Sequence, residues 1–75
     1  MEVDFFIPEE RKAIQVSYSI ADMSTRQREV KALLKLSEIY SLDKLEIVTW
    51  DEETTLSEGR FTVRAIPVWK WLLDI

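Results

Sequence analysis

The feature that most constrains this fold is a long amphipathic segment between two strand-like segments. Residues 24–41 place Val30 and Leu33 on one helical face, which predicts a helix of roughly eighteen residues. Residues 12–20 alternate apolar and polar side chains, and residues 44–50 are largely apolar, so both segments favour strands. Two strands joined by a helix of this length are expected to lie parallel in one sheet.

Two further strands are predicted at the ends of this unit. Residues 2–7 precede a polar turn that begins at Pro8, and they are expected to form an antiparallel hairpin with the next strand. Residues 60–67 alternate again, whereas the acidic segment 51–59 is expected to be an exposed loop. The last residues, 68–75, are expected to form a short helix or an apolar tail.

The order strand–strand–helix–strand–strand predicts one α/β domain (α+β in looser terms) over residues 1–75. Its mixed four-stranded sheet carries one main helix on one face, which leaves the second face poorly covered. Hydrophobic residues make up 47% of the chain, and three of them are Trp. So much apolar surface in so short a chain indicates either a dense core or a surface that a partner covers.

Composition excludes several classes of function. The chain has no Cys and no His, which excludes disulfides, ordinary zinc sites and Cys–His or Ser–His nucleophile pairs. The net charge of −4 disfavours a nucleic-acid partner, because such domains normally carry a basic excess. The N-terminus lacks a signal-peptide pattern, and no apolar run approaches the roughly 20 residues that span a bilayer. We therefore expect a cytoplasmic protein with no membrane partner.

Four polar side chains are expected on one side of the predicted hairpin, namely Glu2, Asp4, Gln15 and Ser17. Facing side chains across an antiparallel pair lie within about 5 Å of one another. Glu2 and Asp4 are the candidate Mg²⁺ ligands, because Mg²⁺ prefers hard oxygen atoms. The alternative is a hydrogen-bonded polar network without chemistry.

This arrangement resembles that of the metal-dependent nucleases of the PD-(D/E)xK, or restriction-endonuclease-like, group. In that group the first hairpin strand gives an Asp and the second gives Glu-x-Lys. Here Gln15 stands where the Glu would be, and Ser17 stands where the Lys would be. The resemblance therefore implies a degenerate site, with Asp4, Gln15 and Ser17 as its remnants. We expect neither catalysis nor a bound Mg²⁺.

Over nearly its whole length the chain also resembles the restriction-endonuclease-like C-terminal domain of a family of prokaryotic AAA-type ATPases. The motifs that carry this resemblance occur in order along the chain: Asp4, Gln15-x-Ser17, Asp22-x-x-Thr25-Arg26-x-Arg28-Glu29, Thr49-Trp50 and Pro67-x-Trp69. The resemblance implies that this chain is a fragment of, or a remnant from, a larger ATPase. The chain has no glycine-rich phosphate loop of its own.

Four further residues are candidates for interaction. Arg26 and Arg28 either contact phosphate or acidic groups of a partner or form a solvated surface, and Arg26 is also expected to pair with Asp4. Trp69 and Trp71 either pack on this domain or dock onto the rest of the parent ATPase or a second copy of the chain. The resulting hypothesis is a non-catalytic accessory domain, and the alternative is a nuclease-like or nucleic-acid-binding module.

Overall fold

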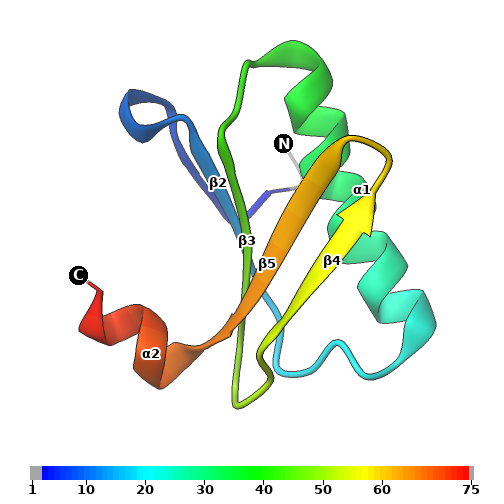
Figure 1. The fold of residues 1–75 in the computed structure, drawn as a ribbon, viewed down its shortest axis with the longest axis vertical. Coiled ribbons are helices and arrows are strands. Elements are labelled where there is room, and N and C mark those ends of the chain that lie inside the picture. Colours follow the sequence, from blue (N-terminus) through cyan, green and yellow to red (C-terminus); the bar gives the residue numbers. More distant parts are fainter. Residues whose placement is uncertain (1–2, 75) are drawn as a thin grey trace.

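Residues 3–74, which the computed structural model describes, fold into a mixed sheet with a long helix packed on one face (Figure 1). In chain order the elements are β1 (Phe5–Ile7), the 3-10 helix η1 (Pro8–Glu10), β2 (Lys12–Val16), α1 (Met23–Ile39), β3 (Lys44–Thr49), β4 (Thr54–Glu58), β5 (Phe61–Pro67) and α2 (Val68–Leu73). The strands lie in the order β1-β2-β3-β5-β4. β2, β3 and β5 run parallel, whereas β1 and β4 are antiparallel edge strands. The predicted α+β class, the single main helix and the parallel β2–β3 pair are confirmed.

The sheet of these residues has five strands, so the prediction of four was wrong. β4 lies within residues 51–59, which were expected to be an exposed loop. It forms there because it pairs along its length with β5 and because Leu56 packs against the core. Gly59, with φ of +60°, begins the two-residue turn between Glu58 and Phe61, as glycine does in type II′ hairpins.

β2 ends at Val16 rather than at residue 20, and the alternating apolar residues of segment 12–20 do not form one buried row, although Ile20 is buried in the main core. Val16 is 53% exposed and Tyr18 is 77% exposed, whereas Gln15 is only 3% exposed. The simple alternation fails because both faces of the central strands are covered. Ala13 packs in the core under α1, and Ile14 packs in the smaller core on the other face.

β1 begins at Phe5, three residues later than predicted. Val3, Phe5 and Ile7 alternate along this segment but do not share one buried face, since Val3 is buried and Phe5 is exposed. Phe6 packs against the main core and contacts the ring of Tyr40, with ring centroids 4.7 Å apart and planes tilted by 45°, whereas Phe5 is mostly exposed.

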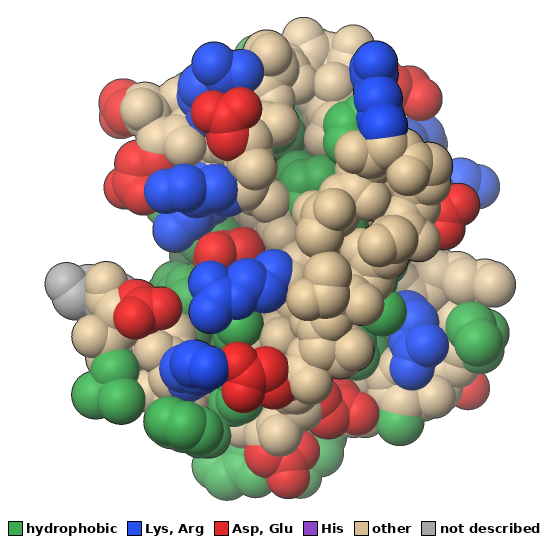
Figure 2. Space-filling view, viewed as in Figure 1, with side chains coloured by type: hydrophobic (Ala, Val, Ile, Leu, Met, Phe, Trp, Pro, Cys, Tyr) green, Lys and Arg blue, Asp and Glu red, His purple; other side chains and the backbone are tan. Residues whose placement is uncertain are grey.

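The main core lies between α1 and the sheet, and a smaller core lies on the opposite face. The main core joins buried residues of α1 to one face of the sheet and includes Val30, Leu33, Leu36, Ala13, Leu45, Ile47, Val63 and Ala65. The smaller core consists of Ile14, Val48 and Ile66, with Val68 and Trp71 of α2 packed against it. Because α2 has only six residues, part of this second face stays uncovered. Figure 2 shows hydrophobic side chains exposed at the end of the molecule where α2 lies.

α1 begins after Asp22, whose carboxylate caps the helix. Its Oδ2 accepts hydrogen bonds from the Ser24 hydroxyl and from the backbone N–H and hydroxyl of Thr25. These bonds, with a smaller contribution from the charge of Arg28, hold the pKa of Asp22 below its usual value. None of the helices formed by residues 3–74 is long and apolar enough to span a membrane.

Candidate functional site

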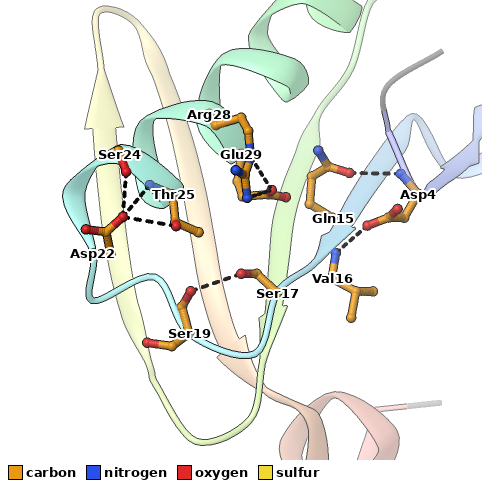
Figure 3. Close-up of polar contacts among 10 residues, drawn as sticks. All are labelled: Asp4, Gln15, Val16, Ser17, Ser19, Asp22, Ser24, Thr25, Arg28 and Glu29. Carbon is orange, nitrogen blue, oxygen red and sulfur yellow. Dashed lines mark hydrogen bonds and ion pairs between the residues drawn. The ribbon is translucent and has the colours of Figure 1, made fainter.

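Asp4 and Gln15 lie side by side where the β1–β2 ladder ends (Figure 3). The Oε1 atom of Gln15 accepts a hydrogen bond from the backbone N–H of Asp4 at 2.8 Å. The Oδ2 atom of Asp4 accepts one from the backbone N–H of Val16, also at 2.8 Å. Two side chains thus take the place of main-chain pairing one residue beyond the last ladder pair, Phe5 with Ile14. The structure therefore brings the first two candidate residues together as partners in backbone hydrogen bonding.

Ser17 is not part of this pair. Its hydroxyl donates to the backbone carbonyl of Ser19 at 2.9 Å, and Figure 3 shows it directed toward Ser19 and away from Asp4. The expectation that all four candidates share one side of the hairpin is wrong for Ser17, because β2 has already ended at Val16. Glu2 lies outside the described residues.

The Asp4–Gln15 pair fits a structural role better than a metal site. One oxygen of each side chain already accepts a backbone N–H, and Mg²⁺ requires a near-octahedral set of oxygen ligands. Within residues 3–74, no three His, Cys, Asp or Glu side chains come together in a way that could hold a metal ion. Asp4 and Gln15 therefore join the two strands of the hairpin by hydrogen bonds at its open end.

The two candidate arginines lie in the first turns of α1 and have local contacts. Arg26 donates from Nε to the backbone carbonyl of Ile20 at 3.1 Å. No ion pair joins Arg26 to Asp4 in the described part of the chain, so that prediction was wrong. The side chain of Arg28 is 72% exposed and pairs with the neighbouring Glu29. Arg28 is therefore available to a partner, whereas Arg26 helps to hold the connection from β2 to α1.

Glu52, which the sequence does not single out, joins two connecting segments. Its Oε1 accepts the backbone N–H of Ile20 at 2.7 Å, and its Oε2 accepts the hydroxyl of Ser19 at 3.1 Å. The buried hydroxyl of Thr49 donates to the Glu52 carbonyl at 2.7 Å and accepts from the Glu52 N–H at 2.9 Å. A Thr-x-x-Glu pattern after a strand is the only sequence signal for this clamp, and it is too common to identify it.

Exposed apolar side chains gather at the carboxyl ends of the parallel strands. Tyr18 follows β2 and Trp50 follows β3, and their rings stack with centroids 6.2 Å apart and planes 8° apart. The two side chains are 77% and 58% exposed. Together with Val16 and Val68 they line a shallow, almost wholly apolar hollow of about 330 Å³. We refer to Val16, Tyr18, Trp50 and Val68 as the aromatic edge.

The two tryptophans of α2 have different surroundings. Trp71 packs against the small core of the second sheet face, whereas Trp69 is 58% exposed. Leu72 and Leu73 are also mostly exposed. Of the two alternatives, packing on this domain therefore applies to Trp71. Trp69 faces outward, next to Val68 of the aromatic edge.

Sequence reasoning missed the aromatic edge because it placed Tyr18 and Trp50 inside strands. The available signal was an aromatic residue one or two positions after the end of each of two parallel strands. At such ends, side chains from neighbouring strands meet at one rim of the sheet.

No protein-family model and no solved structure matches this chain. An uncharacterized protein of Methanocaldococcus jannaschii is 34% identical to it over 79 residues, which cover 96% of this chain and 18% of that protein. The chain thus spans less than a fifth of the length of this relative.

Proposed function

We propose that this chain is a non-catalytic interaction domain of an AAA-type ATPase, and that its aromatic edge docks it onto another part of that larger protein. The observation that carries the proposal is the pair of stacked, mostly exposed rings of Tyr18 and Trp50 beside an apolar hollow. Contiguous apolar surface of this kind is typical of interaction sites. Aromatic side chains contribute much of the binding free energy at such sites.

The ATPase context rests on the resemblance of the ordered motifs to the C-terminal domains of that family. The length of the Methanocaldococcus protein supports a modular setting, because this chain matches only a small part of it. The position of Asp4 and Gln15 on the hairpin supports a truncated restriction-endonuclease-like core that has lost its chemistry. In this proposal the domain is cytoplasmic, carries no cofactor and has the parent ATPase as its partner.

A dye-binding experiment tests the aromatic edge. The isolated chain should bind an apolar fluorescent dye under native conditions, and Tyr18→Ser/Trp50→Ser should lose most of that signal. Ile39→Ser is the matched control, because Ile39 is 73% exposed at the end of α1. Sedimentation of the same proteins shows whether a second copy covers the edge instead. A monomeric wild type that binds no dye would contradict the proposal.

The ATPase context has its own test. The DNA upstream of Met1 should continue in frame into a sequence with a glycine-rich phosphate loop, or an ATPase gene should lie beside it. Absence of both would remove the ATPase from the proposal while leaving the docking surface to be judged by the dye experiment.

A second candidate is a degenerate Mg²⁺-dependent, nuclease-like or nucleic-acid-binding module. It is favoured by one observation, the juxtaposition of the Asp4 carboxylate and the Gln15 amide. This function predicts a calorimetric Mg²⁺ signal that Asp4→Ala abolishes and that Asp51→Ala, in an exposed loop, preserves. A wild type that neither takes up Mg²⁺ nor cleaves DNA or RNA would exclude it.

A further inference from the structure

A buried carboxylate lies in the middle of the sheet face that α2 only partly covers. Glu46 is on β3, the central strand, where its register neighbours are Ile14 of β2 and Arg64 of β5. It is 8% exposed. Acidic side chains are rarely buried to this extent unless they are paired or hydrogen-bonded.

The hydrogen-bonding capacity of Glu46 is incompletely used. Its Oε1 atom is buried and accepts no hydrogen bond. The closest cation is Lys12, whose Nζ lies 3.8 Å away, which is beyond hydrogen-bond distance. That Nζ is also 3.8 Å from a carboxylate oxygen of Glu10, so its charge is divided between two acids. Arg64 is exposed and forms no ion pair with Glu46 in the described part of the chain.

Glu46 lines a hollow of about 400 Å³ between the β1–β2 hairpin and α2. Its charged lining is Glu10, Glu46 and Asp74 against Lys12, a net charge of −2. The remaining walls are the ring of Trp71 and isoleucine side chains from β1, β2 and β5. Figure 2 shows acidic and basic side chains gathered along this side of the molecule.

An adjoining hollow on the same face shares Glu10, Lys12, Glu46 and Asp74 and adds other charged groups. These are Asp43, Lys44 and Arg64, which together contribute +1, and Trp71 does not line this second hollow. The second hollow therefore has a net charge of −1 (−2 plus +1), so the excess of negative charge is larger in the hollow lined by Trp71.

We propose that the hollow beside Trp71 is a binding site for a small organic dication, a short alkyl diamine. One ammonium group donates to Glu46 Oε1 and so supplies the missing hydrogen bond. The alkyl stem lies against the isoleucine walls and the face of Trp71, where a cation is also attracted to the ring. The second ammonium group is held by Glu10 and Asp74, and its charge completes the match to the net charge of the hollow. The absence of a metal-holding cluster within residues 3–74 favours an organic cation over a metal ion.

Calorimetry with 1,4-diaminobutane as the probe tests this site on the whole chain. The wild type is expected to bind it, and Glu46→Gln is expected to weaken binding by about tenfold, the effect of losing one hydrogen bond to a charged group. Asp74 is exposed, so Asp74→Asn should leave the core intact, and it is expected to weaken diamine binding several-fold. This second variant tests the site even if Glu46→Gln fails to fold. Asp51→Asn is the matched control, with the same charge change outside the hollow, and should bind like the wild type.

Three results would overturn the proposal. The first is an absence of binding heat at about ten millimolar diamine, a concentration well above the dissociation constants typical of specific sites. The second is equal weakening by Asp51→Asn and Asp74→Asn, which would indicate attraction to the net charge alone. The third is Mg²⁺ binding that displaces the diamine at equal concentration, which would make the site a metal site. None of these results bears on docking through the aromatic edge.

Discussion

Asp4 and Gln15 each complete a hydrogen bond that the backbone ladder leaves open. Removing the Asp4 carboxylate leaves the backbone N–H of Val16 to water, because this site is exposed. Asp4→Ala should therefore lower the free energy of unfolding by about 1 kcal/mol in urea denaturation. Asp51→Ala, which removes an acid from an exposed loop, should change it much less. Equal effects of the two substitutions would show that Asp4 does not lock the hairpin.

Asp22 links the stability of α1 to pH. Because its pKa is lower in the folded chain than the ordinary 3.8, the carboxylate stabilises the fold fully above that value. This contribution is lost as the pH falls below 3.8 through the folded pKa. Asp22→Asn keeps an N-cap acceptor and should stay folded at neutral pH but lose this part of the acid dependence. Asp22→Ala should lower the urea midpoint at neutral pH as well. An unchanged acid profile for Asp22→Asn would contradict the assignment.

At the scale of elements, Glu52 connects the segment after β3 to the segment that leads into α1. Glu52→Ala should leave the Ile20 N–H and the Ser19 hydroxyl without their acceptor and lower the free energy of unfolding by about 1–2 kcal/mol. Hydrogen exchange at the Ile20 amide should accelerate more than exchange at the amides of β3.

Glu53→Ala is the matched control for this clamp. It removes the neighbouring acid, whose exposed contact with Lys70 is expected to contribute little. If the exchange rate of Ile20 is the same in both variants, Glu52 does not hold the connection.

The elements differ in how far they can be predicted from the sequence. α1 and β3 are predictable because their apolar patterns are long and because both lie against the main core. β4 is not, because an edge strand tolerates charged and polar residues and only Leu56 contacts the core. The end of β2 is not predictable either, since Tyr18 fits a strand pattern but lies beyond the strand, where Glu52 holds the adjoining residues.

In the candidate site, too, some features can be predicted from the sequence and others depend on tertiary contacts. The pairing of Asp4 with Gln15 follows from hairpin register, which the sequence does contain. The burial of Gln15, which lies on the same face of β2 as Ala13 and pairs in register with Ile47 of the main core, depends on a tertiary contact that no local pattern encodes. The buried position of Glu46 has the same origin, because a charged residue in an apolar strand gives no sign of which face it occupies.

For the whole molecule, stability depends on one helix and one sheet. Leu33 is fully buried at the centre of the main core, and Leu33→Ala should cost about 2–5 kcal/mol. In so small a domain this cost is a large share of the free energy of unfolding. Thermal denaturation of the variant should therefore show a large unfolded fraction already at low temperature. Leu73→Ala is the control, because Leu73 is 78% exposed and its loss should leave the transition unchanged. A cooperative transition at the wild-type temperature in Leu33→Ala would contradict this core assignment.

In the proposed arrangement, a larger protein covers the aromatic edge of this domain. The most direct measurement is hydroxyl-radical footprinting of the isolated chain and of a Methanocaldococcus protein in which this chain replaces the matching segment. Oxidation of Tyr18 and Trp50 should fall several-fold in the longer protein. Oxidation of Tyr40, which is 42% exposed and lies outside the aromatic edge, should stay the same. Equal oxidation of Tyr18 and Trp50 in the two proteins would contradict the claim.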